Sequence, residues 1–151
     1  MRAEIQRFLT LLENAPSDRA ARLDELARAL DELAVAIHVL PEGEVADGWE
    51  KEPKPPQVDY NRLSKLAARS FPELGYYPWA DPVGPIGEIS MTGDAIDDLA
   101  DIAKDLSEAM WVWDNVNETT AAWDLHFGYR THWGAHLHNL RAYLHTVITQ
   151  L

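Results

Sequence analysis

The sequence predicts a soluble, single-domain, mostly α-helical protein, and three observations support this prediction. The chain has 151 residues, which fits one domain at the usual length of ~100–200 residues. Apolar residues recur at intervals of three and four along most of the chain, as in amphipathic helices. Cysteine is absent, which excludes disulfides, thiol catalysis and thiolate metal sites. We expect an antiparallel bundle of four or five helices over residues 1–151.

The N-terminal part predicts two helices followed by a connection. The first helix covers residues 2–13, where apolar side chains recur at helical spacing. The second covers 18–40, because Ser17 is a suitable N-cap, an apolar stripe follows and Pro41 ends the pattern. Residues 41–58 are polar and contain several prolines, so we expect a loop there.

A third helix and a long loop follow. Asp59 is the expected N-cap of a helix over 59–70. Residues 71–93 contain four prolines and four glycines, which exclude a continuous helix. A loop of this length is often functional or forms a packed lid. Its aromatic residues either cover the end of the bundle or contact a ligand; the candidate contacts are Tyr76, Tyr77 and Trp79.

The C-terminal part predicts a helical hairpin. One helix covers 94–115, and the last extends from about 118 to the C-terminus, with Asn117 as a candidate cap. A short turn between two long amphipathic helices predicts that they pack antiparallel. We find no strand-like alternation of apolar and polar residues.

The charge limits the classes of function. The net charge is −12, from 25 acidic and 13 basic residues. Such a surface repels phosphate backbones and anionic lipids, so we expect neither nucleic-acid nor membrane binding. It attracts a basic protein partner or a divalent cation. The sequence lacks a signal-peptide pattern and a run of ~20 apolar residues, which makes the cytoplasm the expected location.

Two motifs of the C-terminal hairpin carry the candidate site residues. They are D-D-L-A-D-I and H-W-G-A-H, and the candidates are Asp97, Asp98, Asp101, His132, Trp133 and His136. At about 100° per residue, Asp97 and Asp101 lie on the solvated face of their helix, and Asp98 lies at the core boundary. Reflection of the last helix about the turn near residue 115 brings Asp98 beside His132 and His136.

Two interpretations of this cluster remain open. His132 and His136, spaced i and i+4, can bind one divalent metal ion with Asp98 as the third ligand, which leaves positions for water. Alternatively, the three residues form a structural network that holds the hairpin in register, since buried polar groups need partners. The glutamate of the H-E-x-x-H metalloprotease motif is absent, because Trp133 stands at its position.

The order of several motifs resembles the bacterial DUF5063 family, a family of unknown function. These motifs are D-Y-x-x-L from Asp59, F-P-E-L-G-Y-Y over 71–77, D-D-L-A-D-I over 97–102 and H-W-G-x-H over 132–136. The family commonly has a tyrosine after the D-D-L-x-D-I string, where this chain has Ala103. The resemblance implies a small α-helical domain and supplies no activity.

Two hypotheses of function follow. The first is a protein-interaction module, such as an adaptor or an immunity-type inhibitor, because the chain is small and acidic and lacks a complete catalytic constellation. The second is a metal-dependent hydrolase that uses Asp98, His132 and His136, with the loop 71–93 as its lid. The sequence does not specify the substrate, the partner or the oligomeric state.

Overall fold

The computed structural model describes residues 1–45, 53–87 and 91–150. The elements in these ranges are, in chain order, α1 (Arg2–Glu13), α2 (Arg19–Val39), α3 (Tyr60–Ser70), β1 (Tyr76–Trp79), β2 (Met91–Asp94), α4 (Ala95–Asn115), α5 (Glu118–Thr131) and α6 (Trp133–Thr149). The predicted helical class is therefore confirmed. No helix within the described ranges combines the length and the apolar character that a membrane span requires.

Polar side chains fix where four of the helices begin. Each accepts a hydrogen bond from a backbone N–H in the first turn, which satisfies a group that the helix leaves unpaired. The capping residues are Asp18 of α2, Asp59 of α3, Asp94 of α4 and Asn117 of α5. Ser17, the expected cap of α2, lies one residue before the actual cap.

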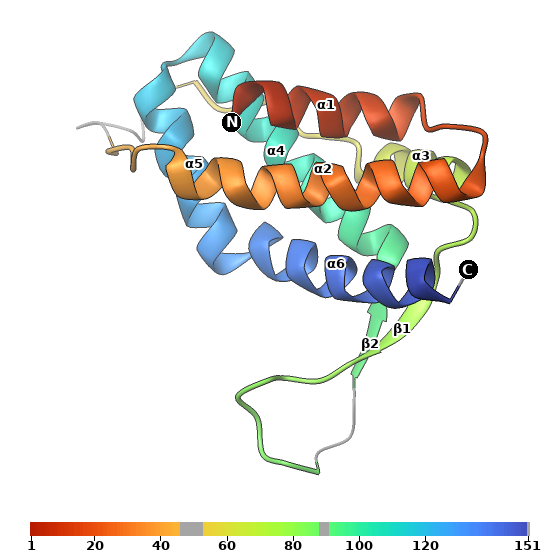
Figure 1. Cartoon of the computed structure of the whole chain (residues 1–151). Helices are drawn as coiled ribbons and strands as arrows, with labels where there is room; N and C mark the ends of the chain where they lie inside the picture. Colours follow the sequence, from red (N-terminus) through yellow and green to blue (C-terminus); the bar gives the residue numbers. More distant parts are fainter. Residues whose placement is uncertain (46–52, 88–90, 151) are drawn as a thin grey trace.

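Helix α4 is the centre of the helical packing. It contacts α1, α3, α5 and α6, while α2 packs on α1 and α6. Figure 1 shows α1 and α2 side by side and antiparallel, with α6 along the other side of α2. The inward side chains of α4, including Leu99, Ile102 and Leu106, are fully buried. Side chains on the remaining faces of α4 therefore meet those of the flanking helices.

The expected single helix from 118 to the C-terminus is wrong: it is two helices, α5 and α6, that meet at His132. Trp133 is buried to 1 % exposure, and its indole N–H donates to the carbonyl of Leu125 at 3.2 Å. A Cβ at Gly134 would lie 2.2 Å from the carbonyl oxygen of Tyr129, so only glycine permits this close approach of α6 to the end of α5. The break directs α6 away from α5 and across α4 (Figure 1).

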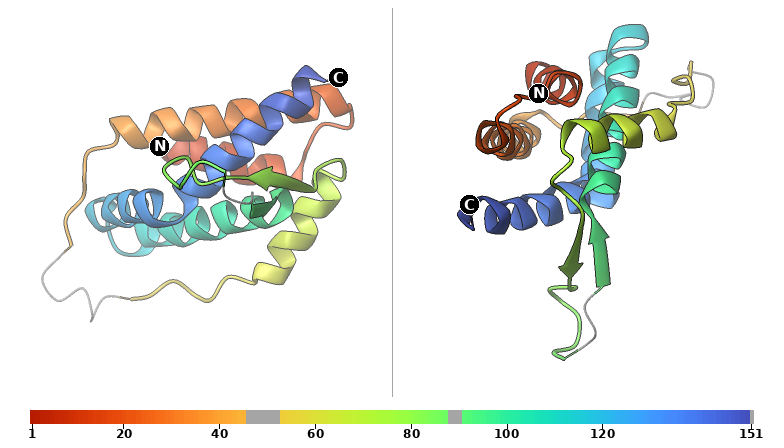
Figure 2. Two further views of the ribbon diagram at one scale, coloured as in Figure 1. Left: turned by 90° about the horizontal axis from the view of Figure 1, so that it is seen from below. Right: turned by 90° about the vertical axis from the view of Figure 1, so that its right-hand side faces the viewer.

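The expected loop over 71–93 contains an antiparallel two-stranded sheet, so the prediction of no strands is also wrong. Tyr76 pairs with Asp94, and Trp79 pairs with Met91. The strands project from the helices (Figure 2). A Cβ at Gly93 would lie 2.4 Å from the ring of Tyr77, which therefore lies flat against the opposite strand. In the other predicted loop, residues 41–45 and 53–58 have no regular structure, and the rest lies outside the described residues.

Candidate functional site

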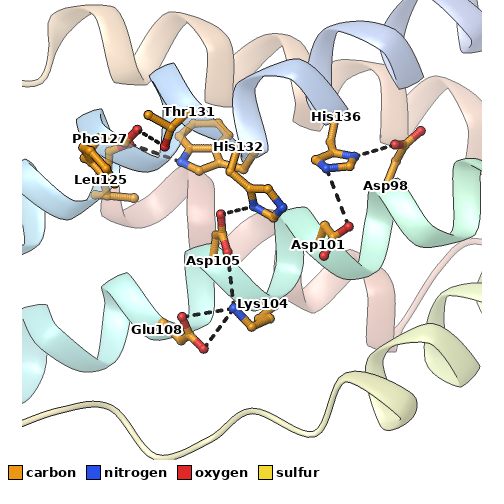
Figure 3. Close-up of polar contacts among 11 residues, drawn as sticks. Asp98, Asp101, Lys104, Asp105, Glu108, Leu125, Phe127, Thr131, His132 and His136 are labelled. Atoms are coloured by element: carbon orange, nitrogen blue, oxygen red, sulfur yellow. Dashed lines mark hydrogen bonds and ion pairs between the residues drawn. The ribbon is translucent and has the colours of Figure 1, made fainter. Parts of the chain in front are cut away.

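One face of α4 presents acidic side chains to the first turn of α6. These side chains lie along α4 at intervals of three or four residues, which places them on one helical face. They are Asp98, Asp101, Asp105 and Glu108, and two histidines at the start of α6 lie against them, His132 and His136 (Figure 3). The rings of the two histidines are edge to face, with centroids 4.9 Å apart.

His136 lies between two carboxylates of α4. Its Nδ1 is 2.7 Å from Asp98 Oδ1, so the imidazole N–H donates to that carboxylate. Its Nε2 lies 3.6 Å from Asp101 Oδ2. The hydrogen bond to Asp98 raises the pKa of His136, against the opposing effect of burial. The ring is thereby oriented with its second nitrogen toward Asp101.

Asp98 is buried and has a partner on each of its two oxygens. Tyr77 of β1 donates its hydroxyl to Oδ2, while His136 occupies Oδ1. The ring of Tyr77 stacks on Tyr143 of α6, with centroids 4.7 Å apart. Burial and the hydrogen bond to Asp98 raise the pKa of Tyr77, so the phenol stays protonated and remains a donor. Asp98 therefore joins β1, α4 and α6.

His132 is oriented by the next carboxylate along α4. Its Nδ1 donates to Asp105 Oδ2 at 2.7 Å. Lys104 lies 3.6 Å from the other oxygen of Asp105 and 3.3 Å from Glu108. In Figure 3, the second ring nitrogen of His132 is directed toward the space between His136 and Asp101. Both histidines thus donate Nδ1–H to a carboxylate and direct Nε2 toward the same region.

Asp101, His132 and His136 form a group that fits one metal ion. Each offers one ligand atom, and these atoms lie within 4.8 Å of one another. Within the described ranges, Asp101 accepts no hydrogen bond, although its side chain is only 18 % exposed. Burial raises the pKa of Asp101, because the charged form of a carboxylate partly removed from water is disfavoured. A bound cation would relieve this cost.

The group of residues that could hold a metal ion differs in one member from the group expected from the sequence. Asp98 was expected as the third ligand, but Tyr77 and His136 Nδ1 take its oxygens. Asp101, which was assigned to a solvated face, lies beside His136 instead. The reason is the break at His132: α6 crosses α4, so His136 lies between two acidic residues one turn apart.

The other predicted site residues lie outside this cluster. Asp97 accepts a hydrogen bond from Tyr60 of α3. Trp133 is a core residue. Of the three candidate loop contacts, Tyr76 is 75 % exposed, Trp79 packs partly against the core, and Tyr77 reaches Asp98. Asp105 was missed as a site residue, although its spacing of four residues from Asp101 was visible in the sequence.

Fold and site together define a small helical domain with a histidine–carboxylate cluster between its fourth and sixth helices. A family model described as a domain of unknown function (DUF5063) matches residues 1–150, so the chain belongs to this family. The crystal structure of protein BF1032 from Bacteroides fragilis is similar, with a TM-score of 0.70 and 21 % sequence identity. The match covers 97 % of this chain and 91 % of that one, which supports a shared fold. No curated protein matches the chain.

Proposed function

We propose that this domain binds one divalent transition-metal ion through Asp101, His132 and His136 and hydrolyses a substrate at that ion. The observation that carries the proposal is the matched orientation of the two imidazoles. Each donates Nδ1–H to a carboxylate, at 2.7 Å in both cases, and presents Nε2 toward Asp101. Carboxylates at this position fix the tautomer of metal-binding histidines and make them stronger ligands.

The donor set supports a first-row ion such as Zn²⁺ or Fe²⁺. Two imidazoles and one carboxylate leave coordination positions open for water and substrate. A zinc ion in such a site lowers the pKa of bound water to about 7 and polarises a carbonyl or phosphoryl oxygen. His132 is 44 % exposed, so solvent and small molecules reach the site from its side.

In this proposal the chain's own residues have separate roles. Asp101 and the two histidines are ligands. Asp98 and Asp105 orient the histidines by accepting the Nδ1–H of each ring. Neither needs to move when an ion binds, because both contact Nδ1 and leave Nε2 to the metal. The structural-network hypothesis explains the two hydrogen bonds equally well, and in it a protonated His136 pairs with Asp101 at 3.6 Å.

Elemental mass spectrometry of tag-free protein, purified without chelator, tests the proposal. We expect about one equivalent of zinc, iron or manganese, lost in the His132→Ala/His136→Ala variant and in Asp101→Asn. His145→Ala is the matched control, because this exposed histidine lies on α6 away from the cluster. Hydrolysis of p-nitrophenyl acetate and bis(p-nitrophenyl) phosphate by metal-loaded protein tests the activity. Absence of metal, with no thermal shift on adding these ions, would leave a structural network.

The protein-interaction hypothesis rests on a different surface, the projecting β-hairpin. Several large apolar side chains on and next to it are exposed, among them Tyr76, Val83, Ile86 and Met91. Exposed apolar side chains on a projecting arm are typical of a contact surface. This second candidate is tested with the Val83→Ser/Ile86→Ser variant. A partner that co-purifies with the wild-type chain and is lost with this variant would support it, whereas equal recovery would contradict it.

A further inference from the structure

The outward face of α3 carries basic side chains, although the whole chain has a net charge of −12. They are Arg62, Lys65 and Arg69, and all three are exposed. At about 100° per residue, their positions lie within about 60° of one another around the helix. Helix α3 lies at the outside of the helical packing, against α4 and α1 (Figure 2). The three side chains therefore form one basic row that faces solvent.

The cations of this row lack an anionic partner within the described ranges. Other basic side chains in those ranges pair with carboxylates, namely Arg2, Arg7, Arg22, Lys104, Arg130 and Arg141. The side chains of Arg62, Lys65 and Arg69 make no hydrogen bond or ion pair with any described residue. Like charges three and four positions apart on a helix repel one another, and an anion bound across them would relieve that repulsion.

A hollow of about 640 Å³ borders the basic row. Besides the three cations, its wall holds the apolar side chain of Leu66 and the amide of Asn61. Two carboxylates, those of Glu13 and Asp59, also line it. Asp59 is already engaged as the N-cap of α3, where it accepts from the backbone N–H of Arg62 at 3.0 Å. The wall therefore offers an excess of positive charge, a hydrogen-bonding amide and one apolar contact.

We propose that the basic row docks an acidic segment of a partner protein in an extended conformation. From Lys65 to Arg69 the helix rises about 6 Å, and from Arg62 to Arg69 about 10 Å. Alternate side chains of an extended segment lie about 7 Å apart on one face, so two carboxylates at alternate positions match two cations of the row. Arginine can hold each carboxylate through two parallel N–H···O contacts. The net charge by itself predicts a basic partner, and this face is a local exception.

A protein segment fits this face better than a nucleic acid does. The row spans only about 10 Å of helix, whereas the chain as a whole carries 25 acidic and 13 basic residues. A duplex would extend past the row onto acidic surface and be repelled there. The row shares no residue with the proposed metal site, so docking of an acidic segment does not rest on the proposed function.

Titration of ¹⁵N-labelled protein with hexaglutamate at low salt, followed by NMR, tests this assignment. Chemical-shift changes should be confined to α3 and the end of α1, and hexaglutamine should bind at least tenfold more weakly. Arg62→Glu/Arg69→Glu should weaken hexaglutamate binding by about tenfold, because two attractive pairs become repulsive. Glu13→Gln should strengthen it by about twofold, since one repelling carboxylate is removed from the hollow.

Arg19→Glu/Arg28→Glu is the matched control, because both arginines are exposed on α2 and likewise pair with no described residue. It changes the net charge by the same amount and should weaken binding by less than threefold. Equal losses in the two double variants, or equal binding of hexaglutamate and hexaglutamine, would overturn the assignment. Tighter binding of duplex DNA than of hexaglutamate would also overturn it, since the partner would then be a nucleic acid.

Discussion

Tyr77 and His136 lie on opposite oxygens of the same buried carboxylate, that of Asp98. The phenol donates to Oδ2, and the imidazole Nδ1 lies 2.7 Å from Oδ1. Tyr77 belongs to the projecting β-hairpin, whereas His136 belongs to the cluster between α4 and α6. One carboxylate therefore connects the hairpin to the candidate metal ligands.

Replacement of Tyr77 by phenylalanine should lower both stability and metal affinity. The variant leaves one oxygen of Asp98 buried without a donor, which costs about 1–3 kcal/mol. Because Asp98 then holds His136 less firmly, we expect metal affinity to fall by roughly tenfold, the lower end of effects through an outer hydrogen bond. Urea denaturation and metal titration measure the two effects. Tyr76→Phe, at a residue 75 % exposed, is the control and should change neither.

Asp98→Asn and Asp101→Asn should differ in a way that identifies the metal ligand. If Asp101 is the ligand, its amide variant should lose more than about 100-fold in metal affinity with little loss of stability. Asp98→Asn should lose only about 10–100-fold, as expected for a residue that orients a ligand, and should be the less stable variant. The reverse order in a metal titration would make Asp98 the ligand, as expected from the sequence.

The stability of metal-free protein should fall as the pH rises through the pKa of His136. The folded state raises this pKa above the usual value of 6.5, chiefly through the hydrogen bond to Asp98. The protonated ring therefore contributes stability that is complete below pH 6.5 and is lost above the folded pKa. The pKa of Asp101 is also raised in the folded state, so its protonated form adds stability that is lost as the pH rises through that pKa. This effect has the same direction as that of His136 but occurs at lower pH.

Bound metal should reverse this pH dependence. Metal and proton compete for the imidazole, so stability of the loaded protein should rise with pH over the same range. Thermal unfolding between about pH 5.5 and 8.5, with and without Zn²⁺, distinguishes the two states. Besides His132, the groups that face His136 are the acidic residues of α4, so Asp98→Asn should flatten the metal-free curve. A metal-free curve that rises with pH would contradict the assignment.

Replacement of Gly134 by alanine should destabilise the junction of α5 and α6. The new Cβ would lie 2.2 Å from the carbonyl oxygen of Tyr129, so one helix must shift, at a cost of about 1–3 kcal/mol. The shift would displace the first turn of α6 and with it both histidines. Gly75→Ala is the control, because no atom lies within 4 Å of the place that a Cβ would take there. Chemical denaturation with equal midpoints for both variants would refute the prediction.

The sequence predicted the helices well where periodicity and caps agree. Asp59 begins α3 as expected, and α4 ends at Asn115 as expected. It failed at His132, where a Cβ at Gly128 would meet the indole of Trp133 and a Cβ at Gly134 would meet the backbone of Tyr129. Nothing in the local sequence separates such close contacts from ordinary helical glycines. It also failed at β1, because proline is uncommon in strands, so Pro78 argued against a strand. In the sequence, Tyr76 and Tyr77 are also the same residue type, although one is exposed and the other buried.

The candidate site was only partly predictable for the same reason. The faces of α4 and of the last helix brought His136 near Asp98, but they placed Asp101 in solvent. Which carboxylate lies beside the free nitrogen of His136 depends on the crossing angle of α6 on α4. That angle is set by the burial of Trp133 and the close contact at Gly134, which are tertiary effects.

The candidate metal group is confined to the C-terminal part of the chain. The candidate ligands and the carboxylates that orient them all lie between residues 98 and 136, whereas α1 and α2 contribute none of them. Asp101 and His132 are separated by about thirty residues, a loop whose closure costs modest entropy. In the proposed metal-bound protein, an ion would link α4 to the start of α6 without any residue of α1 or α2. If this link forms before α1 and α2 dock, metal should accelerate folding and leave the unfolding rate little changed.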